Sequence, residues 1–330
     1  MTRSPFVSVV ICSYNRAQTL GPAIESAACQ KLDAALSFEV VIVDDGSTDG
    51  TDQVVQRTAK RSPVPVRYIK GSGEGVPFAR NRGVQEARGE WIAFFDDDQI
   101  AEDGWLNELI LTAEETGAQI VGGVRRLQFM GEDPPRLGPL TREILGEKYY
   151  GPHRCRVNRF TLACTGNVLI RRQLFVHIGQ FDTDMHRGMT DIDWMRRALD
   201  AGVPSWYSPH AVVRHLIPLH RLSEDYLKWT CLRVGTNLSH INYKSWGPVR
   251  MLFPCLLRAA HALTVNLGME LAARMTADLR AQLDRKCYRW IAFGSARMAA
   301  NLLFPQASAQ DDFFKGLAFR VPRGADAREH

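Results

Sequence analysis

Apolar runs of strand length alternate with segments of helical spacing along the first part of the chain. Buried strands are expected at residues 6–12, 38–43, 64–69, 91–95 and 119–124. Apolar positions that recur every three or four residues predict helices at residues 17–29, 51–61, 76–87 and 102–116. This alternation predicts an α/β fold with a doubly wound, mostly parallel sheet flanked by helices. Ligands of such sheets bind beyond the carboxyl ends of the strands.

Three adjacent carboxylates, Asp96, Asp97 and Asp98, follow the apolar run at residues 91–95. Like charges this close repel by about 1–4 kcal/mol each at partly solvated dielectrics, unless a cation lies among them. One interpretation is therefore a divalent metal site. The other is a solvated acidic turn that caps the next helix.

Two further polar clusters follow expected strands. Ser13, Tyr14, Asn15 and Arg16 come after the first strand, and Asp44 and Asp45 after the second. Because parallel strands place their carboxyl ends at one edge of the sheet, the three loops should converge on one crevice. This convergence favours the metal site over the capped turn.

The later part of the chain holds two more candidates. Residues 125–161 are irregular, rich in proline, glycine and basic residues, and are expected to form a lid or binding loop. After a core segment at residues 162–170 and a short helix opened by Arg171, a helix is expected at residues 190–202, with Thr190 as N-cap and Asp193 reaching back to it. Asp191 in its first turn either complements the helix dipole or faces the crevice.

A strand at residues 206–215 ends in His215. Histidines at strand ends are usually structural, but an imidazole aimed at a site that holds Asp98 can complete the coordination of a divalent ion.

Composition limits the possible functions. The 330 residues suffice for one large domain or two ordinary ones, and 41 Lys+Arg against 36 Asp+Glu is too mild an excess to indicate a nucleic-acid partner. The seven scattered cysteines and the absence of an apolar leader after Met1 lead us to expect a cytoplasmic protein. Gly71, Gly73 and Gly75 do not have the spacing of a dinucleotide-binding loop.

The motifs, taken in order, resemble those of family 2 glycosyltransferases with the GT-A fold. The resemblance covers residues 6–221. It rests on the motifs at residues 9–16, 41–51, 79–83, 87–90, 95–98, 166–172, 179–182 and 190–191.

The resemblance implies a role for each matched residue. A nucleotide-sugar donor would contact Ser13, Tyr14, Asn15, Arg16, Asp44, Asp45, Arg80, Asp96 and Asp97. Mn²⁺ or Mg²⁺ would be bound by Asp98, His215 and Asp96. The catalytic base would be Asp191, and the acceptor would contact Gly166, Asn167, Asp193 and Trp194.

The implied reaction is a metal-dependent transfer with inversion, in which one sugar moves from a nucleotide sugar, a UDP-sugar by preference, to a hydroxyl of a glycan or lipid-linked acceptor in polysaccharide or glycoconjugate synthesis. A single addition is expected because the Gln-x-x-Arg-Trp signature of processive synthases is absent. Thr190 departs from the family, which usually has an acid there. Two alternatives stay open, an inactive sugar-nucleotide-binding scaffold and a sugar nucleotidyltransferase.

The C-terminal part reads as helical. An amphipathic helix is expected at residues 223–240, and residues 248–302 hold two apolar patches with eight Lys/Arg against three Asp/Glu. The first patch, interrupted by Arg258 and His261, is expected to be too short and too polar to span a bilayer. Residues 248–304 would either lie on an anionic membrane as a peripheral surface or pack against the catalytic domain or a second subunit.

These patterns predict three parts. They are a catalytic domain at residues 1–222, with a donor half at 1–124 and an acceptor half at 125–222, a helical extension at 223–310 and a flexible tail at 311–330.

Overall fold

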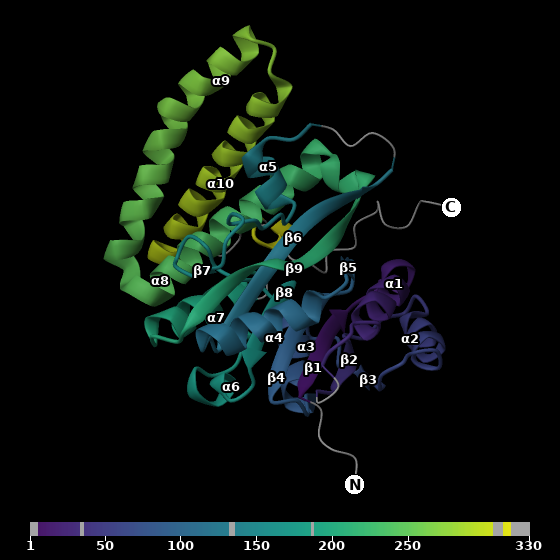
Figure 1. Cartoon of the computed structure of the whole chain (residues 1–330). Helices are drawn as coiled ribbons and strands as arrows, with labels where there is room; N and C mark the ends of the chain where they lie inside the picture. The colour runs from purple at the N-terminus through teal and green to yellow at the C-terminus, as the bar shows by residue number, and fades with distance from the viewer. Residues whose placement is uncertain (1–5, 34–35, 132–135, 186–187, 306–312, 318–330) are drawn as a thin grey trace. The chain divides into compact units, whose positions relative to one another are not determined.

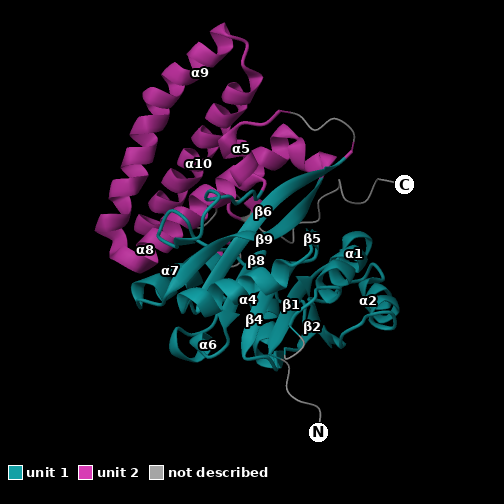
Figure 2. Ribbon diagram, viewed as in Figure 1, with its two compact units in different colours: residues 1–130, 146–185, 190–217 teal, residues 131–145, 186–189, 218–330 magenta. Residues whose placement is uncertain are grey.

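The computed structural model describes residues 6–33, 36–131, 136–185, 188–305 and 313–317 (Figure 1). The chain forms two compact units (Figure 2). The first comprises residues 1–130, 146–185 and 190–217, and the second comprises residues 131–145, 186–189 and 218–330.

The first unit contains the sheet. Its strands are β1 (Val7–Ser13), β2 (Phe38–Asp44), β3 (Val66–Lys70), β4 (Trp91–Asp96), β5 (Gln99–Ala101), β6 (Ile120–Met130), β7 (Cys155–Arg156), β8 (Asn167–Arg171) and β9 (Ser205–Pro218). Its helices are α1 (Ala17–Ala28), α2 (Thr51–Ala59), α3 (Val76–Glu86), α4 (Trp105–Thr116), α6 (Leu174–His177) and α7 (Thr190–Asp200). The predicted alternation of strands and helices is confirmed.

The strands follow the order β3-β2-β1-β4-β8-β6-β9-β5, and β7 pairs with β9. The pairs among β3, β2, β1 and β4 are parallel, whereas β8 is antiparallel to both β4 and β6. The register sets Ser13 beside Asp44, and Cys12 beside Asp96. The polar ends of the three strands therefore meet at one edge of the sheet, as the sequence predicts.

Both faces of β4 are buried, as its continuous apolar run predicts. Trp91, Ala93 and Phe95 pack with α1, α2 and α4 on one face. Ile92 and Phe94 pack with α3, α6 and α7 on the other. The strand therefore cannot move without disturbing two cores, and its end holds the three acids in place.

The chain departs from the prediction after Val124. β6 continues to Met130, and its side chains from Arg125 onward alternate between half-buried and exposed. The sequence shows this alternation, but the pair Arg125 and Arg126 that opens it is typical of a loop. The core segment expected at residues 162–170 is a strand only from Asn167, because residues 162–166 form the turn that leads into β8.

Helices build the second unit: α5 (Pro139–Ile144), α8 (Glu224–Leu263), α9 (Val265–Met275) and α10 (Leu279–Leu303), with 3-10 turns at Leu219–Leu222 and Lys315–Leu317. Two helical segments of α8 meet at Gly247, whose φ of 76° is outside the helical region. A Cβ on Gly235 would lie 2.1 Å from the carbonyl oxygen of Ile291, so α8 and α10 pack at backbone distance there.

The second unit also takes in residues 131–145, which the sequence assigns to the acceptor half of the catalytic domain. Both carboxylate oxygens of Asp284 in α10 accept hydrogen bonds at the start of α5. The donors are the backbone N–H groups of Leu140 and Thr141, at 3.1 and 2.9 Å, and the Thr141 hydroxyl at 2.6 Å. A buried carboxylate that caps α5 from 143 residues away is invisible to local patterns.

Residues 313–317 do not behave as the flexible tail predicted for 311–330. Phe314 is buried, and the Trp229 indole N–H donates to the carbonyl oxygen of Gly316 at 3.0 Å. Residues 311–312 and 318–330 lie outside the described part of the chain.

One helical stretch in the described part of the chain, Glu224–Met275, is long and apolar enough by length and composition to cross a membrane, and 22% of its most apolar window is buried. The patch expected to be too short and too polar to span a bilayer, at residues 251–257, lies inside this longer stretch. Core helices of soluble proteins pass the same test, so the finding alone does not establish a span.

Candidate active site

The pairing of β5 with β9 brings Asp98 and His215 together. Gln99 lies opposite His215 in the antiparallel register, and the Leu216 N–H donates to the carbonyl oxygen of Asp98 at 2.8 Å. The His215 Nε2 atom lies 3.3 Å from Asp98 Oδ1, and both side chains are nearly buried. Asp98 and His215 are far apart in the sequence, yet together they present a carboxylate oxygen and an imidazole nitrogen that could bind one metal ion.

Asp96 lies beside this pair but turns toward Arg125. Its Oδ2 atom lies 3.7 Å from Arg125 Nη1 and accepts a hydrogen bond from the Gln99 amide at 3.3 Å. A Cβ on Gly166 would lie 2.4 Å from each of these charged atoms, Oδ2 and Nη1. Gly166, predicted to bind acceptor, is therefore the residue that leaves room for this ion pair.

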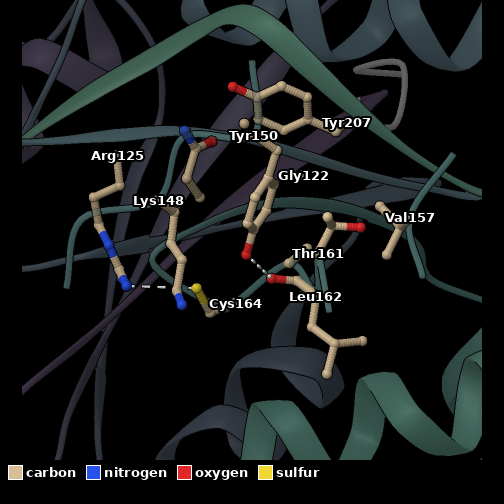
Figure 3. A pocket seen from close by; sticks show the side chains of 12 residues that line it. Gly122, Arg125, Lys148, Tyr150, Val157, Thr161, Leu162, Cys164 and Tyr207 are labelled. Atoms are coloured by element: carbon tan, nitrogen blue, oxygen red, sulfur yellow. Dashed lines mark hydrogen bonds between the residues drawn. The ribbon is translucent and has the colours of Figure 1, made fainter. Parts of the chain in front are cut away.

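Sequence reasoning missed Arg125 and Gln99. Arg125 also donates from Nε to the Gly146 carbonyl oxygen. Its Nη2 atom donates to Cys164 Sγ at 3.5 Å (Figure 3). Burial acts to lower the pKa of Arg125, but the charges of Cys164, Asp96, Asp191 and Asp98 raise it above its ordinary value. The sequence did contain a signal for Arg125, because it is the first basic residue after the buried part of β6, residues 120–124.

The negative charge of Asp96, Asp97 and Asp98 is only partly offset by nearby basic side chains of the protein. Burial raises the pKa of Asp96, and the Arg125 charge only partly opposes this. Burial and the neighbouring Asp98 carboxylate raise the pKa of Asp97 to about 7, although Arg16 acts in the opposite direction. These directions are what is expected of a site in which a further cation would stabilise the ionised carboxylates.

Asp191 opens α7 and is half-buried. Its Oδ2 atom accepts from the backbone N–H and the hydroxyl of Thr165 at 3.3 and 3.4 Å. The adjacent Thr190 is fully buried, and its hydroxyl accepts from Arg80 Nη1 at 2.7 Å. α7 is thus joined to α3 by Thr190, and Asp191 is held against the turn that precedes β8.

The donor loops are joined by side chains. Asp44 accepts from the Ser47 N–H and hydroxyl at 2.9 and 2.6 Å on one oxygen, and from the Tyr68 hydroxyl at 2.6 Å on the other. Asp45 accepts from the Gly75 N–H at 2.9 Å. Asn15, in the left-handed region at φ 51°, accepts from the Thr48 N–H at 2.9 Å.

The residues predicted to contact the nucleotide-sugar donor differ in how far they are buried. Asp44 is buried and organises its own loop. Tyr14 and Asn15 are exposed, and Arg16 is half-buried where it precedes α1. Ser13 is buried at the end of β1, next to Asp44 in the register.

Three residues predicted to bind acceptor are structural. The Asn167 amide is buried and bonds to the Trp105 indole and to the carbonyl oxygens of Val124 and Ala211. Trp194 is fully buried and stacks on Phe175. The motifs locate these residues in the chain without showing which way their side chains point, and a contact with the acceptor stays a prediction.

Asp193 is the third of these residues. It is buried and pairs with Arg197 at 3.0 Å, one helical turn along α7, instead of reaching back to Thr190. Arg197 in turn donates to the carbonyl oxygens of Ile178 and Gln180 at 2.8 and 2.9 Å. The Asp193 carboxylate thus secures α7 to the preceding turn.

A small pocket opens beside Arg125 (Figure 3). Its wall includes Cys164 and two aromatic rings, Tyr150 and Tyr207, with ring centroids 5.3 Å apart. The Tyr150 hydroxyl donates to the Leu162 carbonyl oxygen at 3.0 Å. Lys148, Tyr150, Val157 and Thr161 of the expected loop at residues 125–161 therefore line a cavity beside Arg125.

The donor set fits a hard divalent cation only in part. Within the described ranges, no group of three or more His, Cys, Asp or Glu side chains is arranged to hold a metal, so the predicted set of Asp98, His215 and Asp96 is not assembled. Asp98 and His215 offer one carboxylate and one imidazole. Mg²⁺ and Mn²⁺ sites that take one or two protein ligands and complete their shell with substrate phosphates and water match this pair.

Comparison with known proteins identifies the family. The model of glycosyl transferase family 2 matches residues 8–179, and the chain belongs to this family. A glycosyltransferase of Haloferax volcanii, AglE, is 28% identical over 200 residues, covering 60% of this chain and 62% of that protein. The succinoglycan biosynthesis protein ExoM of Rhizobium meliloti is 25% identical, covering 69% and 72%. The chain thus spans about six-tenths of AglE.

Solved structures share the fold. The mannosyltransferase PcManGT from Pyrobaculum calidifontis, in complex with GDP-Man and Mn²⁺, superposes with a TM-score of 0.64 at 18% identity, covering 92% of this chain and 89% of that one. GalNAc-T7 with UDP, GalNAc and Mn²⁺ gives 0.54 at 18% identity, covering 71% and 48%. The predicted GT-A fold with a C-terminal helical part is confirmed.

Asn167→Ala tests the structural role of this amide. We expect the free energy of unfolding to fall by about 2–4 kcal/mol, because three buried groups lose their partner. Chemical denaturation measures this, and Asn158→Ala, at an exposed turn, is the matched control. An unchanged stability with a raised acceptor KM would instead support the acceptor-binding role.

Arg125→Met tests the charge balance of the site. We expect a lower Tm, because three carboxylates lose a cation, and a larger increase in Tm on adding Mn²⁺ than in the wild type, because the ion then replaces part of the lost charge. Thermal shift assays at several Mn²⁺ concentrations measure both, with exposed Arg126→Met as control. Equal Mn²⁺ shifts in variant and wild type would contradict this role.

Proposed function

We propose that this protein is a metal-dependent, inverting glycosyltransferase that moves one sugar from a nucleotide-sugar donor to a hydroxyl of a glycan or lipid-linked acceptor in polysaccharide or glycoconjugate synthesis. The observation that carries the proposal is the group of Asp98, His215, Asp96 and Asp191 around Arg125 at the carboxyl edge of the sheet. Membership of glycosyl transferase family 2 supports it independently.

Asp98 and His215 would hold Mn²⁺ or Mg²⁺ against the donor diphosphate. A bound divalent ion supplies Lewis-acid stabilisation of the negative charge on a departing nucleoside diphosphate. In this role Asp96 is a positioning residue, because its carboxylate pairs with Arg125 and Gln99. The raised pKa values of Asp96 and Asp97 support a requirement for added positive charge.

Asp191 is proposed as the general base. An acceptor hydroxyl has an alcohol's high pKa and must lose its proton as its oxygen attacks the anomeric carbon. A positioned carboxylate contributes about 10²–10⁴-fold to such a step. The two bonds from Thr165 to one oxygen hold the carboxylate in a fixed orientation. Attack on the face opposite the leaving group gives inversion.

Arg80 and the loops at Asp44 and Asp45 are proposed to form the nucleotide side of the site. Arg80 donates to Thr190 at 2.7 Å, where the family usually has an acid. Because a hydroxyl does not neutralise the guanidinium charge and the Asp96 carboxylate offsets it from a greater distance, Arg80 can also attract the phosphates of a donor.

To identify the donor, transfer activity should be assayed with a panel of UDP-, GDP- and dTDP-sugars in the presence of Mn²⁺. GDP-mannose is bound in the Pyrobaculum enzyme and UDP in GalNAc-T7, so their shared fold does not choose between nucleotides. We propose a UDP-sugar as the first to test. Failure of every sugar in transfer and hydrolysis would favour a catalytically inactive scaffold.

A cytoplasmic location is proposed as well. The seven cysteines are all free thiols, which suits a reducing compartment.

Asp191→Asn should reduce transfer by at least about 10²-fold while donor affinity stays nearly unchanged, because the amide keeps the shape of the side chain but cannot accept the proton. Nucleotide release under acceptor saturation measures the first quantity and calorimetry the second. Asp200→Asn, exposed at the far end of α7, is the control and should be fully active. Near-normal turnover of Asp191→Asn would remove the residue from the base role.

Asp98→Ala should abolish the part of donor binding that depends on metal, since His215 alone is a poor site for a hard cation. Calorimetric titration of the nucleotide sugar with and without Mn²⁺ measures this, and the exposed Asp103→Ala is the control. If the variant keeps the wild-type difference between the two titrations, Asp98 is not a metal ligand.

A further inference from the structure

The helical unit carries an apolar stripe that faces outward. From the second segment of α8 into α9, apolar side chains recur every three or four residues, or every two turns, and therefore share one side of the helices. Their exposed fractions lie between 46% and 79%. We call the following six residues the outer stripe: Val249, Phe253, Leu256, Leu263, Leu267 and Leu271.

The buried side of α9 carries two polar residues, whereas that of the second α8 segment is apolar, with Met251, Cys255 and Ala262. Asn266 is fully buried and donates to the Arg285 carbonyl oxygen at 3.0 Å. Glu270 is buried and pairs with Arg274, at 2.7 Å, and with Arg289 of α10. In α9, polar groups thus face α10 while leucines face outward, the reverse of the pattern expected for a helix in water.

Packing between α8 and α10 uses small and polar residues as well. The Ser239 and Ser295 hydroxyls lie 2.6 Å apart, and Arg258 donates to Ser295 at 2.6 Å. Gly294 approaches the Leu232 carbonyl oxygen so closely that a Cβ would lie 2.4 Å away. Helices that associate in an apolar surrounding rely on small residues and polar contacts of this kind, because burial of apolar surface gives them no advantage.

The exposed charges along this surface are positive. Between residues 241 and 276 the only acid is Glu270, which is buried, whereas Arg250 and Arg274 are exposed. An anionic surface therefore meets no exposed carboxylate there. A two-fold dimer would bring the same patch against itself and oppose like charges, which is unfavourable.

We propose that the outer stripe lies in the interface of an anionic lipid membrane. The apolar side chains enter the boundary between headgroups and acyl chains, and the arginines contact the headgroup phosphates. The helices lie on the membrane instead of spanning it, because α10, which packs against them, carries four arginines and one lysine: Arg280, Arg285, Lys286, Arg289 and Arg297. The inference does not depend on the proposed transfer reaction.

Vesicle binding by the full chain tests the proposal. Sedimentation with vesicles of phosphatidylcholine and phosphatidylglycerol is compared with vesicles of phosphatidylcholine alone. The wild type should bind the anionic vesicles at least tenfold more tightly, and the affinity should fall with salt. A triple variant, Phe253→Glu, Leu256→Glu and Leu267→Glu, should lose at least tenfold of this binding.

Two controls make the result decisive. Val176→Glu replaces an equally exposed apolar residue in the first unit and should bind as the wild type does. Circular dichroism melting of the triple variant should show a Tm no lower than that of the wild type, because the three side chains are exposed and do not build the core. Light scattering reports the mass in solution.

Three outcomes would overturn the proposal. The triple variant could bind anionic vesicles as tightly as the wild type, the wild type could bind neither vesicle, or the wild type could be a dimer that the triple substitution converts to a folded monomer. The last would assign the outer stripe to a second copy of this chain.

Discussion

Repulsion among carboxylates at the ends of buried strands is the constraint on which the catalytic unit depends. Asp96, Asp97 and Asp98 cannot move apart, because β4 is packed on both faces and β5 is paired with β9. Arg125 offsets part of their charge and reaches Asp191 electrostatically. The negative charge that Arg125 does not offset would be neutralised by a divalent ion held by Asp98 and His215.

The surrounding elements serve to hold this group of charges. Gly166 leaves space for the contact of Asp96 with Arg125, Gln99 supports Asp96, and Thr165 orients Asp191. Farther along the same edge, the bonds of Asp44, Asp45 and Asn15 join three loops into one wall. The site is thus built from backbone turns secured by side chains, which preorganises it for a charged ligand.

The helical unit follows a different physical rule. Its buried contacts combine two small apolar clusters with hydroxyls, an amide, an ion pair and close backbone approaches, while leucine and phenylalanine of the outer stripe point outward. The exposed apolar side chains of the outer stripe, together with polar contacts between the helices, suit this face to apolar surroundings. The kink at Gly247 separates a first segment of α8 with several buried side chains from the segment that carries the outer stripe.

The sequence by itself determined the alternation of strands and helices and the edge at which the loops of Asp44, Asp96 and Asp98 meet, because apolar periodicity and strand ends are local properties. Its motifs also determined the family. Only the tertiary structure decided that Asn167, Asp193 and Trp194 are buried and structural, that Arg125 lies among the acids, and that Asp284 secures α5. Side-chain direction and contacts across a hundred residues depend on how elements pack, and no local pattern carries that information.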